Sequence, residues 1–230
     1  MLEEAQAGRR EVLATDGLPS GPLEIRKGEV RMAQEYVAKP LKPQCLQMTG
    51  ISQRQIDEHY NILYKGYVAK LNEIRSKLET VDPTKGNQTY SDLRELKVEE
   101  SFALNAIKLH EMYFDNLGGK GGRPTGRTLE LIEKSFGSYE KWEADFKGSG
   151  MAARGWVVLA YDLDDGLLHN YIADSHNTYG IWNAVPILIL DTYEHAYGID
   201  YGVKRPPYID AFMQNLDWDA VSERVAKLPG

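Results

Sequence analysis

Residues 52–78, SQRQIDEHYNILYKGYVAKLNEIRSKL, carry a strong helical pattern. Ser52 followed by Gln55 is a capping-box pattern, in which two side chains satisfy free amide groups at a helix N-terminus. After it, apolar residues recur every three or four positions, which is the period of an amphipathic helix. These residues are Ile56, Tyr60, Leu63, Tyr67, Leu71, Ile74 and Leu78. The pattern predicts one long helix that ends near Asp82-Pro83.

A second helix is predicted further along the first half of the chain. Its apolar face and its C-terminal glycine are Ala103, Ala106, His110, Tyr113, Leu117 and Gly118. The glycine-rich stretch from 118 to 126 is loop by composition and predicts a boundary between two halves. We therefore expect a helical hairpin domain over residues 46–118. Residues 1–45 are mixed in charge and weakly periodic, and they are expected to form an N-terminal extension that wraps the domain or is mobile.

The second half, 127–230, is expected to be an α/β domain. Two β-rich runs are separated by a turn that contains Asp164-Asp165-Gly166, which predicts a hairpin, and a third aliphatic run ends at Asp191. Short helices are predicted around these strands. The expected strands are 156–161, 167–173 and 187–190, and the expected helices are 128–136, 138–153 and 207–228 with a break at 215–219. The order predicts an α+β fold, with a helical hairpin followed by a small three-stranded antiparallel sheet flanked by helices.

Composition limits the classes of function. The chain has 230 residues, 42% of them apolar, and a formal net charge of -7, which argues against nucleic-acid or anionic-membrane partners. No apolar run is long enough to span a membrane, and the N-terminus lacks the apolar region of a secretory signal, so we expect a cytoplasmic protein. Cys45 is the only cysteine. Any metal must therefore be held by histidine and carboxylate side chains.

Three histidines and one aspartate stand out as candidate metal ligands. His59 and His110 lie on the apolar faces of the two predicted helices, where a buried imidazole needs a partner. Asp191 directly follows an aliphatic strand, where a charge is costly without a cation, and His195 comes four residues later. Taken alone, either of His59 and His110 is better explained as an ordinary core histidine bonded to a neighbour. Together the four groups suit iron, manganese or zinc, of which only iron and manganese cycle between the +2 and +3 states.

Several local sequences resemble the iron/manganese superoxide dismutases. They are IDEHY at 56–60, YVAKLN at 67–72, Gly155-Trp156, DTYEHAY at 191–197, Asp200-Tyr201, Arg205-Pro206 and Tyr208. The resemblance runs from about residue 48 to 228 with the motifs in order. It implies a redox-cycling iron or manganese ion, one per chain, that converts superoxide to oxygen and hydrogen peroxide.

The resemblance also implies roles for individual residues. His59, His110, Asp191 and His195 match the four metal ligands. Tyr67 matches the family's active-site tyrosine, Trp156 an aromatic residue packed against the metal pocket, and Arg205 an arginine near the entrance that can attract a small anion. Glu194 and His195 match the pair that links two subunits in the family, so we expect a homodimer or a dimer of dimers.

The sequence departs from the family at several positions. Leu63 and Gly198 replace a histidine and a tyrosine that bond across the dimer interface, and Tyr193 replaces a tryptophan of the pocket. Ala106 cannot supply the usual hydrogen-bond donor to solvent on the metal. His176 is assigned that role, with an ordinary loop histidine as the alternative.

These departures leave other functions open. A superoxide-dismutase-like protein with a different oxygen or peroxide chemistry, or with a purely structural metal, fits the same ligands. Iron versus manganese, dimer versus tetramer, and the survival of dismutase activity beside Leu63 and Gly198 are not decided by the sequence.

Overall fold

The computed structural model describes residues 35–178 and 180–229. Most of the predicted N-terminal extension, residues 1–34, lies outside them. Within the described residues, no helix combines the length and the apolar character needed to cross a membrane.

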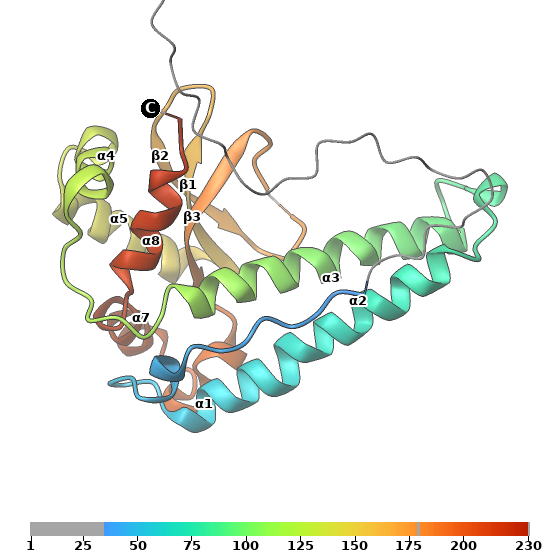
Figure 1. The fold of residues 1–230 in the computed structure, drawn as a ribbon, viewed down its shortest axis with the longest axis horizontal. Helices are drawn as coiled ribbons and strands as arrows, with labels where there is room; N and C mark the ends of the chain where they lie inside the picture. The colour runs from blue at the N-terminus through green and yellow to red at the C-terminus, as the bar shows by residue number, and fades with distance from the viewer. Residues whose placement is uncertain (1–34, 179, 230) are drawn as a thin grey trace, which may run out of the picture. The chain divides into compact units, whose positions relative to one another are not determined.

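The first half is a helical hairpin, in which α2 (Lys65–Leu78) and α3 (Asp92–Asp115) lie side by side (Figure 1). α1 (Gln53–Glu58) leads into α2 through a π-helical stretch, His59–Tyr64, so the predicted single helix is interrupted at the first candidate ligand. A short 3-10 helix, Pro83–Lys85, lies in the connection between α2 and α3. π-Helical turns are rare and are frequently found at functional sites.

The capping box predicted at Ser52 is half formed. Ser52 Oγ accepts the backbone N–H of Gln55 at 3.1 Å, as expected. The backbone N–H of Ser52 donates to Asp200 Oδ2 at 2.7 Å instead of to the Gln55 side chain. The Gln55 side chain is therefore used elsewhere.

The start of the described chain lies along the hairpin (Figure 1). The backbone N–H of Tyr36 donates to Asn72 Oδ1 at 2.8 Å, and that of Lys39 donates to the Tyr64 hydroxyl, also at 2.8 Å. The Tyr60 hydroxyl donates to the Lys39 carbonyl at 2.5 Å. A 3-10 helix, Pro43–Leu46, follows and precedes α1.

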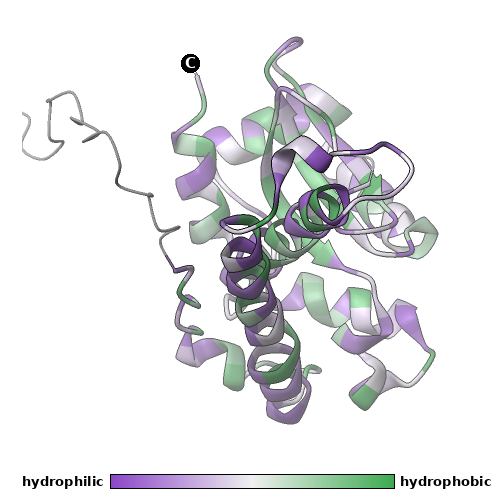
Figure 2. Ribbon diagram, turned by 90° about the vertical axis from the view of Figure 1, so that its right-hand side faces the viewer, coloured by the Kyte–Doolittle hydropathy of each residue, from purple (hydrophilic) through white to green (hydrophobic). Residues whose placement is uncertain are grey.

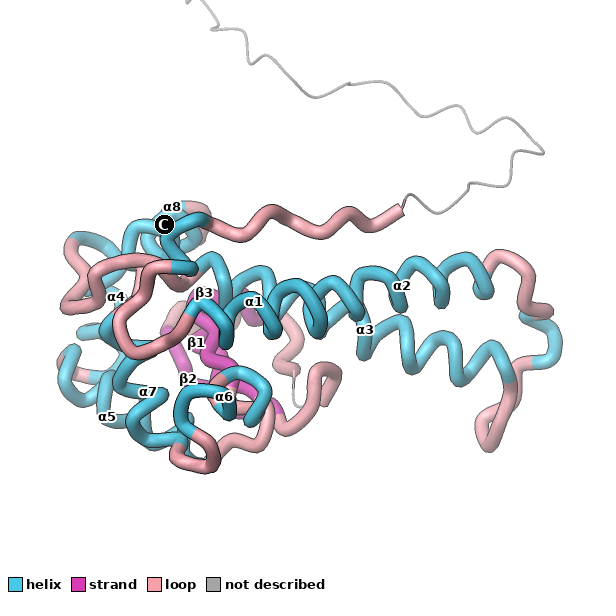
Figure 3. Tube along the Cα trace, turned by 90° about the horizontal axis from the view of Figure 1, so that it is seen from below, coloured by secondary structure: helices cyan, strands magenta, loops and turns pink. Residues whose placement is uncertain are grey.

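The second half contains a three-stranded antiparallel sheet in the order β2-β1-β3. Its strands are β1 (Trp156–Asp162), β2 (Leu168–Ala173) and β3 (Ala184–Asp191), and β3 starts three residues before its predicted start. Helices surround the sheet, as the ribbon and tube views show (Figures 1 and 3). They are α4 (Gly126–Phe136), α5 (Tyr139–Ala152), α6 (Gly198–Tyr201), α7 (Arg205–Gln214) and α8 (Trp218–Ala226), with a 3-10 turn at Glu194–Ala196. The predicted α+β fold is confirmed.

One core joins the hairpin to the sheet. The helices turn their apolar faces inward and carry polar residues outside (Figure 2), as the amphipathic patterns predict. The end of α3 lies against β3, where Asn116 Nδ2 donates to the Ile189 carbonyl at 3.0 Å. The C-terminal part of α3, which carries His110, is thereby held near the end of β3, which carries Asp191.

Strand register brings three chain segments together at this end of the sheet. Trp156, the first residue of β1, pairs with Ala173 at the end of β2 and with Asp191 at the end of β3. Gly155 precedes it, and a Cβ atom there would lie 2.6 Å from the Ala173 carbonyl oxygen. Glycine is therefore required where these segments approach one another.

Candidate metal centre

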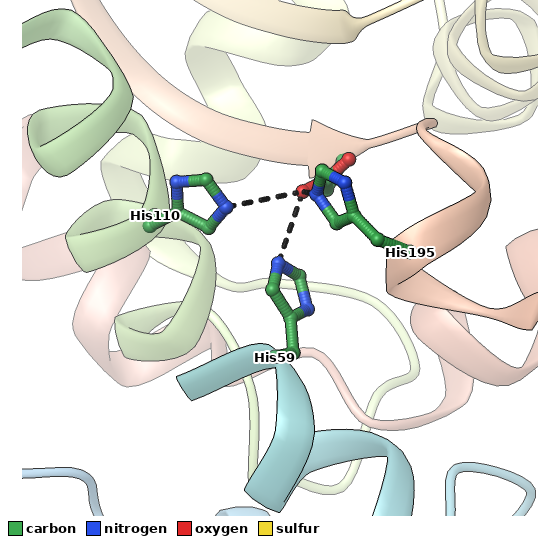
Figure 4. Close-up of side chains that lie close together, drawn as sticks. His59, His110 and His195 are labelled. Atoms are coloured by element: carbon green, nitrogen blue, oxygen red, sulfur yellow. Dashed lines mark hydrogen bonds and ion pairs between the residues drawn. The ribbon is translucent and has the colours of Figure 1, made fainter. Parts of the chain in front are cut away.

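The four candidate ligands converge on one point (Figure 4). His59 comes from the π-helical stretch, His110 from α3, Asp191 from the end of β3, and His195 from the 3-10 turn that follows. Asp191 Oδ2 lies 3.0 Å from His195 Nε2, 3.2 Å from His59 Nε2 and 3.7 Å from His110 Nε2. Residues separated by more than 130 positions in the sequence thus present one donor atom each to a shared site.

Hydrogen bonds orient these groups from behind. His110 Nδ1 lies 2.7 Å from the Ala106 carbonyl, which can only accept, so Nδ1 carries the proton and Nε2 presents a lone pair. Asp191 Oδ1 accepts the backbone N–H of Tyr193 at 2.9 Å, which leaves Oδ2 facing the imidazoles. The Tyr208 hydroxyl donates to the Asp191 carbonyl at 2.7 Å. Such bonds on the far side of a ligand are typical of metal sites.

Burial and charge act against each other in this cluster. Burial lowers the pKa of His59 and of His110, the latter to about 3, so both imidazoles are neutral. Burial would raise the pKa of Asp191, but the adjacent His195 and His59 outweigh it and hold that pKa below its usual range. Burial would lower the pKa of His195, but the Asp191 carboxylate outweighs it and raises that pKa. Three imidazoles and one carboxylate are a suitable ligand set for a divalent or trivalent metal, which would displace the proton that Asp191 favours on His195.

The residues present fit a metal ion. Both ring nitrogens of His59 and Nε2 of His110 are buried without a hydrogen-bond partner among the described residues. Such atoms are costly to bury, and a metal would bind His59 Nε2 and His110 Nε2. Two ligands about 2.1 Å from one ion and at right angles to each other lie about 3 Å apart, close to the shorter separations observed. We conclude that the cluster has the donor atoms and spacing of a metal site.

The π-helical stretch places Tyr67 next to the cluster. Eight residues of regular α-helix would leave Tyr67 about 80° away from His59 around the helix axis. The wider turns of the π-helix rotate less per residue and reduce this angle. The Tyr67 ring lies 5.7 Å from the His110 ring, centroid to centroid.

Tyr67, His176 and Trp156 form a chain of hydrogen bonds. Trp156 Nε1 donates to His176 Nδ1 at 2.9 Å, and His176 Nε2 lies 2.9 Å from the Tyr67 hydroxyl. Because indole N–H can only donate, His176 Nδ1 must be the acceptor, and the ring proton of neutral His176 is on Nε2. Burial lowers the pKa of His176 to about 4, which favours this neutral form. His176 therefore donates to Tyr67, and the hydroxyl proton of Tyr67 remains available to another acceptor.

Aromatic side chains line the rest of the site. Trp156 is fully buried, with its ring 5.0 Å from His110 and nearly perpendicular to it. Tyr193 stacks on His195 with ring centroids 5.1 Å apart. Leu63, in the π-helical stretch, is half-buried. A Cβ atom at Gly198 would meet no atom within 4 Å, so this position faces open space.

Arg205 and Glu194 are placed outside the ligand cluster. The Arg205 guanidinium donates to the carbonyls of Gly150, Met151 and Ala153 at the end of α5, at 3.3, 3.4 and 2.6 Å. It also donates to the Tyr197 hydroxyl at 3.3 Å. Glu194 is exposed, beside a His195 side chain that is 25% exposed.

Sequence reasoning missed two side chains that contact the site. Phe102 of α3 lies 4.6 Å from His176, ring to ring, and no pattern distinguishes it from other residues of its helix. Gln55 donates from Nε2 to the His195 carbonyl at 2.6 Å, although the capping pattern assigned it a local role. The one available signal was a polar residue on the apolar side of the first helix, four residues before His59.

Comparison with known proteins identifies the family. Residues 124–224 match the family of iron/manganese superoxide dismutases, C-terminal domain. An iron superoxide dismutase from Aquifex pyrophilus is 47% identical over 192 residues, which cover 81% of this chain and 89% of that protein. One from Cupriavidus metallidurans is 41% identical, over 83% of this chain and 96% of that protein. A manganese superoxide dismutase from Haloarcula marismortui is 34% identical over 77% of this chain and 86% of its own length. The chain therefore belongs to the iron/manganese superoxide dismutase family.

Proposed function

We propose that this protein is a superoxide dismutase whose iron or manganese ion is held by His59, His110, Asp191 and His195. The observation that carries the proposal is the convergence of these four groups, with Nε2 of two buried histidines lacking a hydrogen-bond partner in the part of the chain that the structure describes. Family membership supports the same reaction, in which two superoxide ions and two protons give oxygen and hydrogen peroxide.

The bound metal supplies one-electron chemistry by alternating between its +2 and +3 states. The chain's residues hold it with three imidazoles and one carboxylate and surround it with rings that exclude water. Trp156, Tyr113 and Phe114 are buried beside the ligands. Exclusion of water strengthens the electrostatic effect of each charged group in the site.

Tyr67 and His176 are the proposed proton-handling residues. Burial and the nearby Asp191 raise the pKa of Tyr67, so its hydroxyl keeps its proton at neutral pH. Because His176 donates to Tyr67, the hydroxyl proton of Tyr67 can be donated to a substrate oxygen. Reduction of superoxide to hydrogen peroxide requires two protons, and this pair holds one at the Tyr67 oxygen and one at His176 Nε2.

Arg205 is the proposed attractor of the anionic substrate. The net charge of -7 provides no general attraction for superoxide. Arg205 donates only to neutral oxygens and forms no ion pair with a described carboxylate, so its positive charge is not neutralised locally. Arg205 attracts superoxide through its charge, so this attraction weakens as ionic strength rises.

A homodimer is the proposed assembly, with a dimer of dimers as the alternative. Glu194 is exposed and adjoins His195, one of the candidate ligands, and its carboxylate makes no hydrogen bond or ion pair within the described part of the chain. An exposed carboxylate at this point can accept a hydrogen bond from His195 of a second copy.

The cytoplasmic location remains a prediction from the sequence.

Metal analysis combined with a superoxide assay tests the proposal. Apoprotein is loaded separately with iron and with manganese, bound metal is counted per chain, and superoxide consumption is measured. We expect one ion per chain and activity with at least one of the two metals. Metal binding without superoxide consumption by either form would contradict the proposed function and favour a structural metal or another oxygen chemistry.

A further inference from the structure

The side chain of Gln55 joins the two segments that carry the first and the last candidate ligands. Gln55 lies in α1, four residues before His59, and is only 1% exposed. Its Nε2 donates to the His195 carbonyl at 2.6 Å, and its Oε1 accepts the backbone N–H of Ile199 at 3.0 Å. One amide thus holds both ends of the turn from 195 to 199 against the helix of His59.

The chemistry of these contacts requires an amide. The His195 carbonyl can only accept and the Ile199 N–H can only donate, so the side chain must present one donor and one acceptor. A carboxylate would place an oxygen against the His195 carbonyl. An apolar side chain of the same length would leave the His195 carbonyl and the Ile199 N–H without these part-buried hydrogen bonds, which is costly.

A second buried amide, Asn215, provides a comparison. Asn215 Nδ2 donates to the carbonyls of Thr49 and Ala211, both at 2.7 Å, and its Oδ1 accepts the N–H of Thr49 at 3.2 Å. Asn215 is 5% exposed and, like Gln55, links the start of the hairpin to the second half of the chain. It bonds no residue of the ligand turn. The two amides therefore differ in one respect. Gln55 bonds the backbone of a candidate metal ligand, and Asn215 does not.

We propose that Gln55 is a positioning residue of the metal site, which fixes the His195 main chain relative to the helix of His59 and so controls how tightly the metal is retained. The inference rests on the proposed function. Among the described residues, the His195 side chain hydrogen-bonds only to Asp191, and His195 lies in a short 3-10 turn. Because ligand geometry depends on where that turn lies, the Gln55 amide sets the distance between His59 and His195.

Metal release tests this proposal. Metal-loaded wild type, Gln55→Met and Asn215→Leu are mixed with excess chelator under native conditions, and the rate of metal loss is measured together with the denaturant midpoint of each apoprotein. We expect Gln55→Met to release metal on the order of tenfold faster than wild type, by analogy with other residues that orient ligands. The electron paramagnetic resonance spectrum of its bound metal should also change.

Asn215→Leu is the matched control. It should lower the denaturant midpoint while the release rate and the spectrum stay as in wild type. Equal release rates for Gln55→Met and wild type, or equal acceleration in both variants, would overturn the positioning role. If Gln55→Met does not fold, Gln55→Glu is judged by the same criteria. A wild-type protein that binds no metal would contradict the proposed function itself, whereas unchanged release by a metal-binding variant contradicts only the role of Gln55.

Discussion

The two ligands on helices, His59 and His110, and the two at and after the end of β3, Asp191 and His195, are held by different forces. His59 and His110 are completely buried among rings, including Tyr113 and Phe114, and many contacts define their positions. Asp191 and His195 lie where the chain leaves the sheet, and individual hydrogen bonds hold their backbone. The positions of His59 and His110 therefore depend on packing against many rings. The positions of Asp191 and His195 depend on a few specific polar contacts.

Asp191→Asn gives the largest expected effect, because it changes the one charge that the three imidazoles share. The substitution keeps the shape of the side chain and removes the anionic oxygen that lies 3.0 to 3.7 Å from each His Nε2. We expect metal affinity to fall by more than about 100-fold, since changing outer partners of ligands alone costs roughly 10- to 100-fold. Metal content and superoxide consumption measure this. A variant that retains one ion per chain and full activity would show that Asp191 is not a ligand.

His176→Ala distinguishes metal binding from catalysis. His176 bonds Trp156 and Tyr67 and touches neither pair of ligands through a hydrogen bond. We expect full metal content and activity reduced by about 100-fold or more, because a proton donor is lost. His169→Ala, on the half-exposed face of β2, serves as the control and should leave both quantities unchanged. Unchanged turnover in His176→Ala would remove His176 from the mechanism.

Comparing Tyr208→Phe with Phe114→Leu tests directly whether a hydrogen bond holds the Asp191 backbone while ring packing holds the ligands on helices. Tyr208→Phe deletes a hydrogen bond and leaves the buried Asp191 carbonyl without its hydroxyl partner, which should lower the free energy of unfolding by about 1–3 kcal/mol. Phe114→Leu changes one ring among several and should cost less than about 1.5 kcal/mol. Denaturant unfolding of the apoproteins gives both values. The reverse ranking would contradict the claim that the chain from Asp191 to His195 depends more on a single hydrogen bond than the helix-borne ligands depend on a single ring.

The smallest expected effect concerns the Cys45 thiol. Its reactivity measures how closely the chain packs around Phe114, beside the helix-borne ligands. Its Sγ lies 3.4 Å from the carbonyl of Phe114, and burial raises the pKa of the thiol to about 11. Because the unfolded thiol ionises near pH 9 and the folded thiol does not, its contribution to stability is present below pH 9 and is lost as pH rises to about 11. We expect no reaction of the native protein with a thiol reagent at pH 8 and complete reaction in denaturant. Rapid reaction of the native protein would show that reagent reaches Cys45 and that the packing around Phe114 is loose.

The same contrast explains how far the sequence could predict the molecule. Ile56, Tyr60 and Leu71 recur with the helical period, so the hairpin and the inward positions of His59 and His110 followed from local pattern. The α+β class followed from the order of the predicted elements. Packing on a regular element repeats along the sequence and is therefore visible in it.

Contacts between distant residues left no such pattern. Asp191 and His195 are four residues apart, but Asp191 ends β3 and the turn Glu194–Ala196 is 3-10, so no single regular element places both side chains. The π-helical stretch at His59 has no sequence signal. The Gln55 amide fits a local cap by sequence and bonds a residue 140 positions away in the structure.

Anomalous diffraction from crystals of the metal-loaded protein tests the central claim most directly. Data collected on either side of the iron or manganese absorption edge locate that element without assumptions about its ligands. We expect one peak per chain, within about 2.3 Å of Nε2 of His59, His110 and His195 and of Oδ2 of Asp191. A metal-loaded crystal with no peak between these four atoms, or with its peak elsewhere on the chain, would contradict the account.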